Sequence, residues 1–240
     1  MNIDWLERTE LLIQREGIDK LVNANVLVVG LGGVGSFAAE FIARAGVGKM
    51  TIVDGDEVDP TNTNRQLPAM TSTVGQSKAQ LMASRIKDIN PEIQLTVIEE
   101  FLSPERMEEV VSKEFDFVCD CIDSITPKVN LIKTACRKKV KLVSSMGAGG
   151  KLDPTKLEVK DISKTFNCKM ARYVRKQLKK DKIDRYFKCV FSSEVQDENS
   201  LKLTDGKNFK KSFYGTISYM PALFGCAVAS VAIRYLIAQK

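Results

Sequence analysis

The stretch that most constrains the fold is residues 26–41, VLVVGLGGVGSFAAEF, where an apolar run breaks into glycines and then resumes with helix-forming residues. This order predicts a strand, a turn and a helix, the context in which Gly30, Gly32 and Gly35 in G-x-G-x-x-G spacing bind a nucleotide. Glycines let the backbone approach phosphate closely, and a helix N-terminus offers unpaired N–H groups. Asp54 ends the next apolar run, nineteen residues after Gly35, and is placed to bind ribose hydroxyls. These features indicate an adenine nucleotide and leave NAD and ATP open.

Further apolar runs alternate with helical patterns through the first 150 residues. The intervening segments have the apolar spacing of helices that pack on a sheet, and Ser103-Pro104 predicts the start of one of them. We therefore expect an α/β fold with a Rossmann-like, mostly parallel sheet flanked by helices. We predict a single domain over residues 1–240, with a nucleotide-binding core at about 20–150. The predicted strands lie within 26–30, 49–56, 93–101, 115–123 and 140–147.

Positive charge is concentrated beyond this alternation, in the polar segment 151–212. The chain carries a formal charge of +6, yet residues 164–188 alone hold ten Lys or Arg against two Asp. A local basic patch indicates a polyanionic partner, with a solvated helix face as the alternative. We interpret about 160–212 as a basic insertion that forms a lid or binds nucleic acid. Its aromatic residues, Tyr173, Tyr186 and Phe187, would stack on unpaired bases or belong to the core. The candidate nucleic-acid contacts are Lys169, Arg172, Arg175, Lys176, Lys179 and Lys180.

The stretch 212–233 has no charged residue, which raises the question of a membrane helix. Its densely apolar part, from Tyr219 to Ile233, falls short of the roughly 20 residues that a span requires. We predict a C-terminal core helix at about 219–238, and membrane association remains the less favoured alternative. The first ten residues lack the apolar region of a secretion signal, so we expect a cytoplasmic protein.

The cysteine and histidine content limits which metal sites and catalytic groups the chain can have. The six cysteines are scattered without a C-x-x-C pair, and there is no histidine, so we expect reduced thiols and no structural zinc. The absence of histidine also removes the commonest general base. Any catalysis must therefore rely on other side chains or on the substrate itself.

A phosphate-loop reading of the glycine stretch fails, because that motif needs Gly-Lys-Ser/Thr and Gly35 is followed by Ser36 and Phe37. A triphosphate would need cations from elsewhere. Arg65 and Lys78 follow the second predicted strand and are the candidates, although each is by default a surface residue. Asp123 ends the predicted strand 115–123, where it would hold Mg²⁺ or else cap the following helix.

The order of motifs resembles that of the ubiquitin-activating-enzyme-like adenylyltransferases over nearly the whole chain. The motifs are GLGGVGS, VDGDEVDPTNTNRQ, VGQSKAQ, DCID followed by Ser124, SSMGAGGKLDPTKL and CVFSSE. Within that superfamily, TNTNRQ, GAGGKLDP and CVFSSE are most similar to the tRNA threonylcarbamoyladenosine dehydratase branch. The molybdopterin and thiamine sulfur-carrier branches often carry paired zinc-binding cysteines, which this chain lacks.

The resemblance implies a set of ATP contacts. The glycines would line the phosphates, Asp54 would bind the ribose, and Asp123 would place Mg²⁺, with Arg65, Lys78 and Asp123 as the catalytic residues. Many relatives have Asn where Ser124 stands, and in several an N-terminal arginine from a partner subunit reaches the ATP, which leaves Arg8 and Arg15 as candidates. The full set of predicted nucleotide contacts is Gly30, Gly32, Gly33, Gly35, Asp54, Asp56, Asn64, Arg65, Gln66, Lys78, Asp123 and Ser124.

The reaction implied by the resemblance is ATP-dependent cyclisation of threonylcarbamoyladenosine next to the tRNA anticodon, by adenylation of the threonyl carboxylate. One alternative is activation of the C-terminal glycine of a ubiquitin-like sulfur carrier, with Cys168 or Cys189 as sulfur acceptor. Another is a non-catalytic, nucleotide-sensing tRNA-binding module; an NAD-dependent dehydrogenase is disfavoured. The resemblance also implies a homodimer and leaves open a sulfur-transfer or electron-transfer protein partner.

Overall fold

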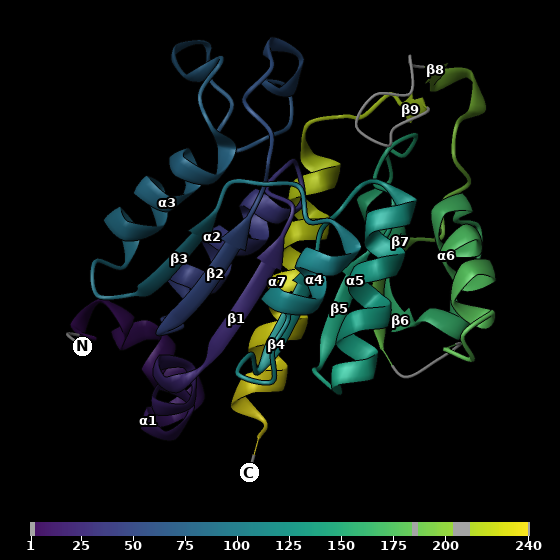
Figure 1. The fold of residues 1–240 in the computed structure, drawn as a ribbon. Coiled ribbons are helices and arrows are strands. Elements are labelled where there is room, and N and C mark those ends of the chain that lie inside the picture. The colour runs from purple at the N-terminus through teal and green to yellow at the C-terminus, as the bar shows by residue number, and fades with distance from the viewer. Residues whose placement is uncertain (1–2, 184–186, 204–211, 240) are drawn as a thin grey trace.

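The architecture is a seven-stranded sheet between two layers of helices (Figure 1). The computed structural model describes residues 3–183, 187–203 and 212–239. The sheet has the order β3-β2-β1-β4-β5-β7-β6, in which all neighbours pair in parallel except β6, which runs antiparallel to β7. The predicted α/β fold is thus confirmed. The strands are β1 Asn25–Val29, β2 Lys49–Val53, β3 Gln94–Ile98, β4 Phe117–Asp120, β5 Leu142–Ser145, β6 Leu157–Asp161 and β7 Lys188–Ser192.

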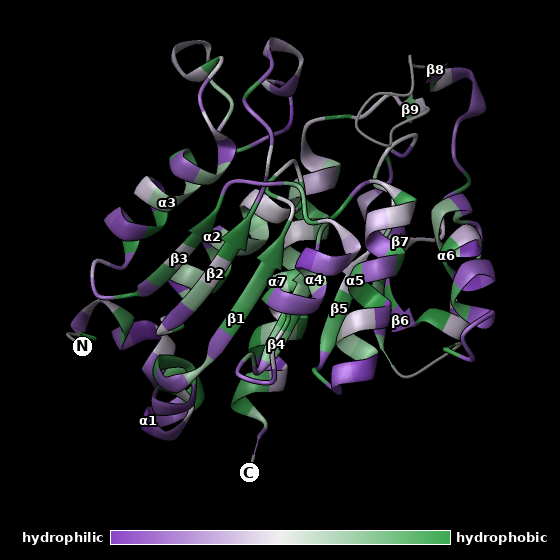
Figure 2. Ribbon diagram, in the orientation of Figure 1, coloured by the Kyte–Doolittle hydropathy of each residue, from purple (hydrophilic) through white to green (hydrophobic). Residues whose placement is uncertain are grey.

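The central strands are apolar because they are covered on both faces, as parallel strands normally are. Along β1, Val26 and Val28 pack in one hydrophobic core, whereas Leu27 and Val29 pack in the other. Figure 2 shows the apolar strands between helices that turn hydrophilic residues outward. The first core lies under α1 Glu7–Asn23, α2 Gly35–Arg44, α3 Lys78–Ile89 and α7 Tyr219–Ile237, and the second under α4 Pro104–Val110, α5 Ile125–Lys138 and α6 Lys169–Lys179.

Short elements complete the fold and include one predicted helix start. Ser103 caps α4 by accepting a hydrogen bond from the Arg106 amide at 3.2 Å, and Pro104 is the first helical residue, as predicted. Two short strands, β8 Leu201–Leu203 and β9 Ser212–Tyr214, form a separate antiparallel pair. The 3-10 helices are Asp4–Leu6, Pro60–Asn62, Thr71–Thr73, Pro154–Lys156, Ile162–Lys164 and Glu198–Ser200.

The segment interpreted as an insertion or lid is largely part of the main sheet. Residues 157–161 and 188–192 form β6 and β7, and α6 covers the sheet face between them. The lid interpretation is wrong for these strands, because they belong to the main sheet. The sequence did not reveal β7, because charged residues precede its buried run. Phe187 is a core residue with 4 % exposure, Tyr173 is exposed, and Tyr186 lies outside the described residues.

The predicted C-terminal apolar helix is confirmed as α7. It is long and apolar enough to cross a membrane by length and composition. However, its inner face, which includes Met220, Phe224 and Val228, is buried in the core shared with α2. Figure 1 shows α7 running along the sheet as a core helix would.

Candidate functional site

The predicted nucleotide contacts lie in the segments that follow β1, β2 and β4, whose carboxyl ends are at the top of Figure 1. The strand order reverses at β1, which pairs with β2 on one side and β4 on the other. In open α/β sheets, ligands bind in the crevice at such a switch point. The loops after β1, β2, β4 and β5 therefore frame the candidate site.

Two of the loop glycines are required by the fold itself. Gly30 has a φ of +89°, and a Cβ there would lie 2.9 Å from the Cys121 carbonyl oxygen. A Cβ on Gly35 would lie 1.7 Å from the Gly30 carbonyl oxygen, so only glycine lets α2 begin this close to β1. Gly33 lies against Pro221 at the start of α7, where a Cβ would be 2.9 Å from that ring. These contacts place the glycine loop between the loop after β4 and helix α7.

Gly32 is different, because the described part of the chain leaves room for a side chain there. The nearest described atom to an added Cβ, outside the chain neighbours, is Gln66 Nε2 at 3.7 Å, an ordinary contact distance. The fold therefore does not require glycine at this position. A ligand that approaches the backbone closely would require it. Helix α2 also begins without a side-chain cap, which leaves its N-terminal amides to such a ligand.

Gln66 lies beside this glycine with an unsatisfied oxygen. Its Oε1 is buried and has no hydrogen-bond partner among the described residues. Buried polar atoms without a partner are rare in folded proteins and call for an explanation such as an absent ligand or water. Gln66, one of the predicted nucleotide contacts, thus has a side-chain oxygen next to the glycine loop that can accept a hydrogen bond from a ligand or a water molecule.

Asp54 braces the glycine loop, a role that its sequence position does not reveal. Its Oδ2 accepts a hydrogen bond from the Leu31 amide at 2.5 Å, and its Oδ1 accepts one from the Asp56 amide at 2.8 Å. Burial raises the pKa of the Asp54 carboxyl, and the two backbone hydrogen bonds act in the opposite direction. Each carboxylate oxygen keeps a further lone pair, so a ribose hydroxyl can still donate to it.

Lys78 is buried, and its ammonium group forms an ion pair with Asp56. It is 5 % exposed and begins α3 directly after the cap residue Ser77. Its Nζ lies 3.1 Å from Asp56 Oδ2, and its amide donates to the Asp56 carbonyl. The surface-residue alternative is therefore wrong for Lys78, because the structure joins it to the loop after β2.

Arg65 and Asn64 link this loop to the segment before α7. Arg65 Nη1 donates to the Thr61 carbonyl at 2.9 Å and to Asn64 Oδ1 at 2.8 Å, and Asn64 Nδ2 donates to the Thr216 carbonyl at 2.9 Å. Burial lowers the pKa of the Arg65 guanidinium, and the Asp123 carboxylate raises it. The Asp123 carboxylate thus influences the charge of Arg65, although the two residues come from loops far apart in sequence.

Asp123 lies in the loop beyond β4 rather than in the strand. The strand ends at Asp120, and Asp123 is an exposed residue whose Oδ1 accepts a hydrogen bond from Ser124 Oγ at 3.2 Å. The cap residue of α5 is Ser124, so the helix-cap alternative for Asp123 is wrong.

A metal at this position would have few protein ligands. Within residues 3–183, 187–203 and 212–239, no three His, Cys, Asp or Glu side chains cluster to form a metal site. Mg²⁺ at phosphate sites is usually held by one or two carboxylates together with the phosphates and water. The single carboxylate of Asp123 fits that arrangement. On its own it would not bind a metal ion, so the phosphates of a nucleotide would have to supply further ligands.

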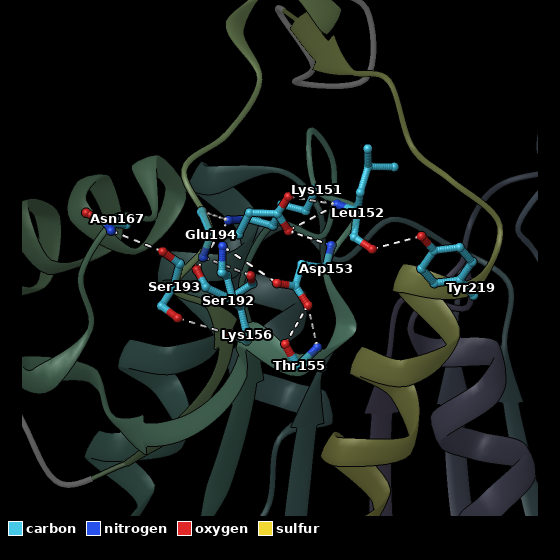
Figure 3. Close-up of polar contacts among 10 residues, drawn as sticks. All are labelled: Lys151, Leu152, Asp153, Thr155, Lys156, Asn167, Ser192, Ser193, Glu194 and Tyr219. Atoms are coloured by element: carbon cyan, nitrogen blue, oxygen red, sulfur yellow. Dashed lines mark hydrogen bonds and ion pairs between the residues drawn. The ribbon is translucent and has the colours of Figure 1, made fainter.

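Two motifs that carry the family resemblance meet at the other side of the site (Figure 3). The Glu194 carboxylate accepts hydrogen bonds from the amides of Leu152 and Asp153, and Lys151 Nζ donates to the Glu194 and Ser192 carbonyls. Lys151 is 2 % exposed, and burial lowers the pKa of its ammonium group. The motifs GAGGKLDP and CVFSSE do not predict this contact from the sequence, because the two segments are about forty residues apart.

The start of α7 also reaches this side of the site, which the sequence analysis missed. Tyr219 Oη donates to the Leu152 carbonyl at 2.8 Å, and Pro221 lies on the glycine loop. Gln196 Nε2 donates to the Gly149 carbonyl, while its buried Oε1 has no partner among the described residues. Unlike the glycine loop, these residues belong to no short motif with a known mechanism.

Helix α6 presents a basic face to solvent. Its inner side buries Ala171, Val174 and Leu178. Two predicted contacts are engaged within the protein: Lys169 with Glu198 at 2.9 Å, and Arg175 with the Thr165 carbonyl at 3.0 Å. The exposed basic residues are Arg172, Lys176, Lys179 and Lys180, and the structure records no ion pair for them among the described residues.

The candidate sulfur acceptors are buried. Cys189 is fully buried in β7, and burial raises the pKa of its thiol well above the ordinary value. Cys168 is 5 % exposed at the start of α6. Near the site, burial raises the pKa of Cys121 to about 12. A thiol must be accessible and ionised to act as a nucleophile, so these surroundings disfavour a role for Cys189.

We expect the buried thiols to resist alkylation in the folded protein. Iodoacetamide at pH 8 should leave Cys119 and Cys189 unmodified, because each is buried and holds its proton at that pH. Peptide mass spectrometry with and without guanidinium chloride measures this directly. Rapid modification of Cys189 in the folded chain would reopen the sulfur-acceptor alternative.

The candidate arginines Arg8 and Arg15 lie on α1, at the end of the sheet opposite the glycine loop (Figure 1). Arg15 pairs with Asp19 at 3.0 Å, whereas Arg8 is exposed. Neither can contribute to the site of its own chain. A contribution to the site of a second subunit remains a prediction.

Comparison with known proteins decides the family. The model of the ThiF family matches residues 6–240. The chain belongs to the ThiF family. This ThiF-family chain is 46 % identical over 187 residues to the tRNA threonylcarbamoyladenosine dehydratase of Bacillus subtilis, covering 78 % of this chain and 74 % of that protein. It is 37 % identical to the Escherichia coli protein of the same name, covering 98 % and 95 %.

A solved structure agrees with the fold of this ThiF-family chain. The crystal structure of the E. coli dehydratase, TcdA, in complex with ATP matches it with a TM-score of 0.88 and 36 % identity, over 98 % of this chain and 95 % of that chain. The match spans the whole architecture, including β6, β7 and α7. The family and fold that the motifs predicted are thus confirmed.

Proposed function

We propose that this protein is an ATP-dependent tRNA threonylcarbamoyladenosine dehydratase that cyclises the modified base next to the anticodon. The observation that carries the proposal is the glycine loop with room at Gly32, framed by Arg65, Lys78 and Asp123. Similarity over almost the whole length to dehydratases, one of them solved with ATP, supports it. A sensor of nucleotides would not need two cations and a carboxylate around the phosphates.

The chemistry requires alignment and charge neutralisation more than covalent help. A threonyl carboxylate that attacks the α-phosphorus of ATP displaces pyrophosphate and becomes an acyl-adenylate. The amides at the start of α2 would hold the phosphates, and Arg65 and Lys78 would stabilise the developing negative charge. Mg²⁺ held by Asp123 would neutralise charge on the phosphates. No histidine is needed for this step.

Ring closure needs no nucleophile from the protein. In the acyl-adenylate, the neighbouring carbamoyl group attacks the activated carbonyl carbon, AMP leaves, and a ring forms with net loss of water from the base. Intramolecular attack has a high effective molarity, which supplies several kcal/mol of the barrier without an enzymic group. This accounts for a site in which the nearby thiols of Cys119 and Cys121 have raised pKa values and remain protonated.

The basic face of α6 would hold the tRNA backbone, and its contribution is measurable. We expect K176A/K179A to weaken tRNA binding about tenfold and to reduce the salt slope by roughly 0.7–0.9 per lost phosphate contact. Both lysines are exposed on the solvent side of the helix. The matched control K113A/K141A removes two exposed lysines near the amino ends of β4 and β5, and binding should not change. Equal loss in both variants would refute the assignment.

The proposed function is tested by the substrate that triggers ATP consumption. AMP and pyrophosphate release should require tRNA that carries threonylcarbamoyladenosine and should be absent with the same tRNA lacking the modification. Release with the C-terminal peptide of a ubiquitin-like sulfur carrier, and none with modified tRNA, would favour the alternative adenylyltransferase. Binding of ATP and tRNA without any release would favour the sensor.

We further propose that the protein is cytoplasmic and acts as a homodimer. Only the inner face of α7 is buried in the core, and its outer residues Tyr219 and Leu223 are exposed, so a second copy would cover apolar surface there. Sedimentation of the purified protein with and without ATP tests the dimer.

A further inference from the structure

A fully buried ion pair lies beneath the candidate site. Asp120 ends β4 and Lys128 is in the first turns of α5, and both side chains are 0 % exposed. Lys128 Nζ donates to Asp120 Oδ2 at 2.7 Å, to the Ser145 carbonyl at 2.8 Å and to Ser144 Oγ at 3.3 Å. Ser144 Oγ in turn donates to Asp120 Oδ2 at 2.5 Å. All three protons of the ammonium group are used, so the network is complete.

The pair joins two of the loops that frame the candidate site, one of which carries Asp123. Asp120 Oδ1 accepts a hydrogen bond from the Ile122 amide at 3.1 Å, directly before Asp123. On the other side, Ser145 is the last residue of β5 and leads into the loop 146–150. Lys128 thus holds the start of one loop through Asp120 and the start of the other through a backbone carbonyl.

The same loop also supports the glycine loop. The Cys121 carbonyl lies where a Cβ on Gly30 would be 2.9 Å away, and the Cys121 amide donates to the Val29 carbonyl at 2.9 Å. Any shift of residues 121–122 would therefore push against Gly30, the first glycine of the glycine loop. Three loops of the site share one buried support.

Stability alone does not explain this arrangement. Two charges lose their hydration on burial, and apolar residues of similar volume often stabilise a protein as well or better. The network instead ends on two backbone groups, the Ile122 amide and the Ser145 carbonyl, which no apolar pair could hold. A device that fixes loop geometry needs such directional contacts.

We propose that Asp120 and Lys128 are positioning residues that set the spacing between the loop with Asp123 and the loop 146–150, and that this spacing is required for adenylation. The inference rests on the proposed function. Neither side chain reaches solvent, so neither contacts the substrate; both act through the loops. A displacement of about 1 Å can reduce a rate by about 10²-fold when reacting groups must be aligned.

The test replaces the pair with neutral side chains of similar shape. D120N/K128M should unfold cooperatively, yet its kcat for AMP formation should fall by about 10²-fold. Its KM for tRNA should stay within a factor of about three, because α6 is untouched and a tenfold change in binding would need about 1.4 kcal/mol. Hydrogen exchange, measured without ATP, should show faster exchange of the Ile122 amide and of residues 121–124.

A matched control separates positioning from general loss of an ion pair. E40Q/R85Q removes a partly buried pair between α2 and α3, which touches neither loop, and should change stability without lowering kcat. If D120N/K128M does not fold, S144A keeps the ion pair and removes only the bridging hydroxyl. S144A should lower kcat and speed exchange at Ile122.

Results that overturn the positioning role differ from results that overturn the proposed function. Unchanged kcat in D120N/K128M, or in S144A where the double variant does not fold, overturns the positioning role. Unchanged exchange at residues 121–124 overturns it as well, and does so without any activity measurement. Failure of the unsubstituted chain to release AMP with modified tRNA would instead overturn the proposed function.

Discussion

Replacement of Arg65 by alanine is expected to lower the rate of AMP formation by about 10²–10³-fold, the typical loss when one group that stabilises transition-state charge is removed. The guanidinium is influenced by the charge of Asp123 and donates hydrogen bonds to Thr61 and Asn64. Those partners belong to its own turn, so we expect the free energy of unfolding to change by less than about 1 kcal/mol. Steady-state AMP release and thermal unfolding of the same sample measure both quantities.

The control for this variant is R106A. Arg106 is a half-exposed arginine on α4 that pairs with Glu100 and Glu109, outside the candidate site. Its loss should leave AMP formation unchanged. K78M should lower activity like R65A but cost more stability, because Lys78 is buried and anchors Asp56. Normal ATP consumption by R65A or K78M would refute the assigned phosphate contacts.

Substitution of the loop glycines is expected to separate folding from nucleotide binding. G32A should fold, because the nearest described atoms to its new methyl group belong to Gln66 and lie at van der Waals distance. It should nevertheless weaken ATP binding at least about tenfold, equivalent to about 1.4 kcal/mol, because the methyl group occupies the space where phosphate approaches the backbone. Calorimetric titration with ATP and circular dichroism measure binding and folding.

G35A provides the contrast. Its methyl group would lie 1.7 Å from the Gly30 carbonyl oxygen, so α2 must move away from β1 and the protein should be unstable or insoluble. The two glycines belong to one motif but have different reasons to be glycine. A G32A protein that binds ATP as tightly as the unsubstituted chain would show that the ligand does not approach this side of the loop.

The sequence was most informative where its patterns are local. The runs at 49–56, 93–101, 115–123 and 140–147 contain β2 to β5, and the run at 26–30 covers β1 except its first residue, because a parallel strand buried on both faces is a continuous apolar segment. The charged segment around α6 concealed β6 and β7, since short strands beside many lysines lack that signal. The sequence also did not show which distant segments contribute to the candidate site. Its contacts include Thr216, Tyr219 and Pro221, which lie near the C-terminal end of the chain.

Candidate site residues could be named from sequence, but the reasons for several could not. Lys78 looked like a surface residue and is buried against Asp56, while Asp54, predicted only as a ribose contact, braces the glycine loop. The Asp120–Lys128 pair gave no signal, because a carboxylate and an ammonium eight residues apart acquire meaning only when a helix folds back on its strand. Pairings of this kind depend on distances that no spacing rule encodes.

The most direct test of the central claim is to analyse the tRNA itself. The purified protein is incubated with Mg·ATP and tRNA that carries threonylcarbamoyladenosine, and the digested nucleosides are examined by mass spectrometry. We predict ATP-dependent appearance of a nucleoside lighter than threonylcarbamoyladenosine by one water, with AMP formed alongside it. Unchanged threonylcarbamoyladenosine after incubation with competent tRNA and ATP would contradict the dehydratase assignment.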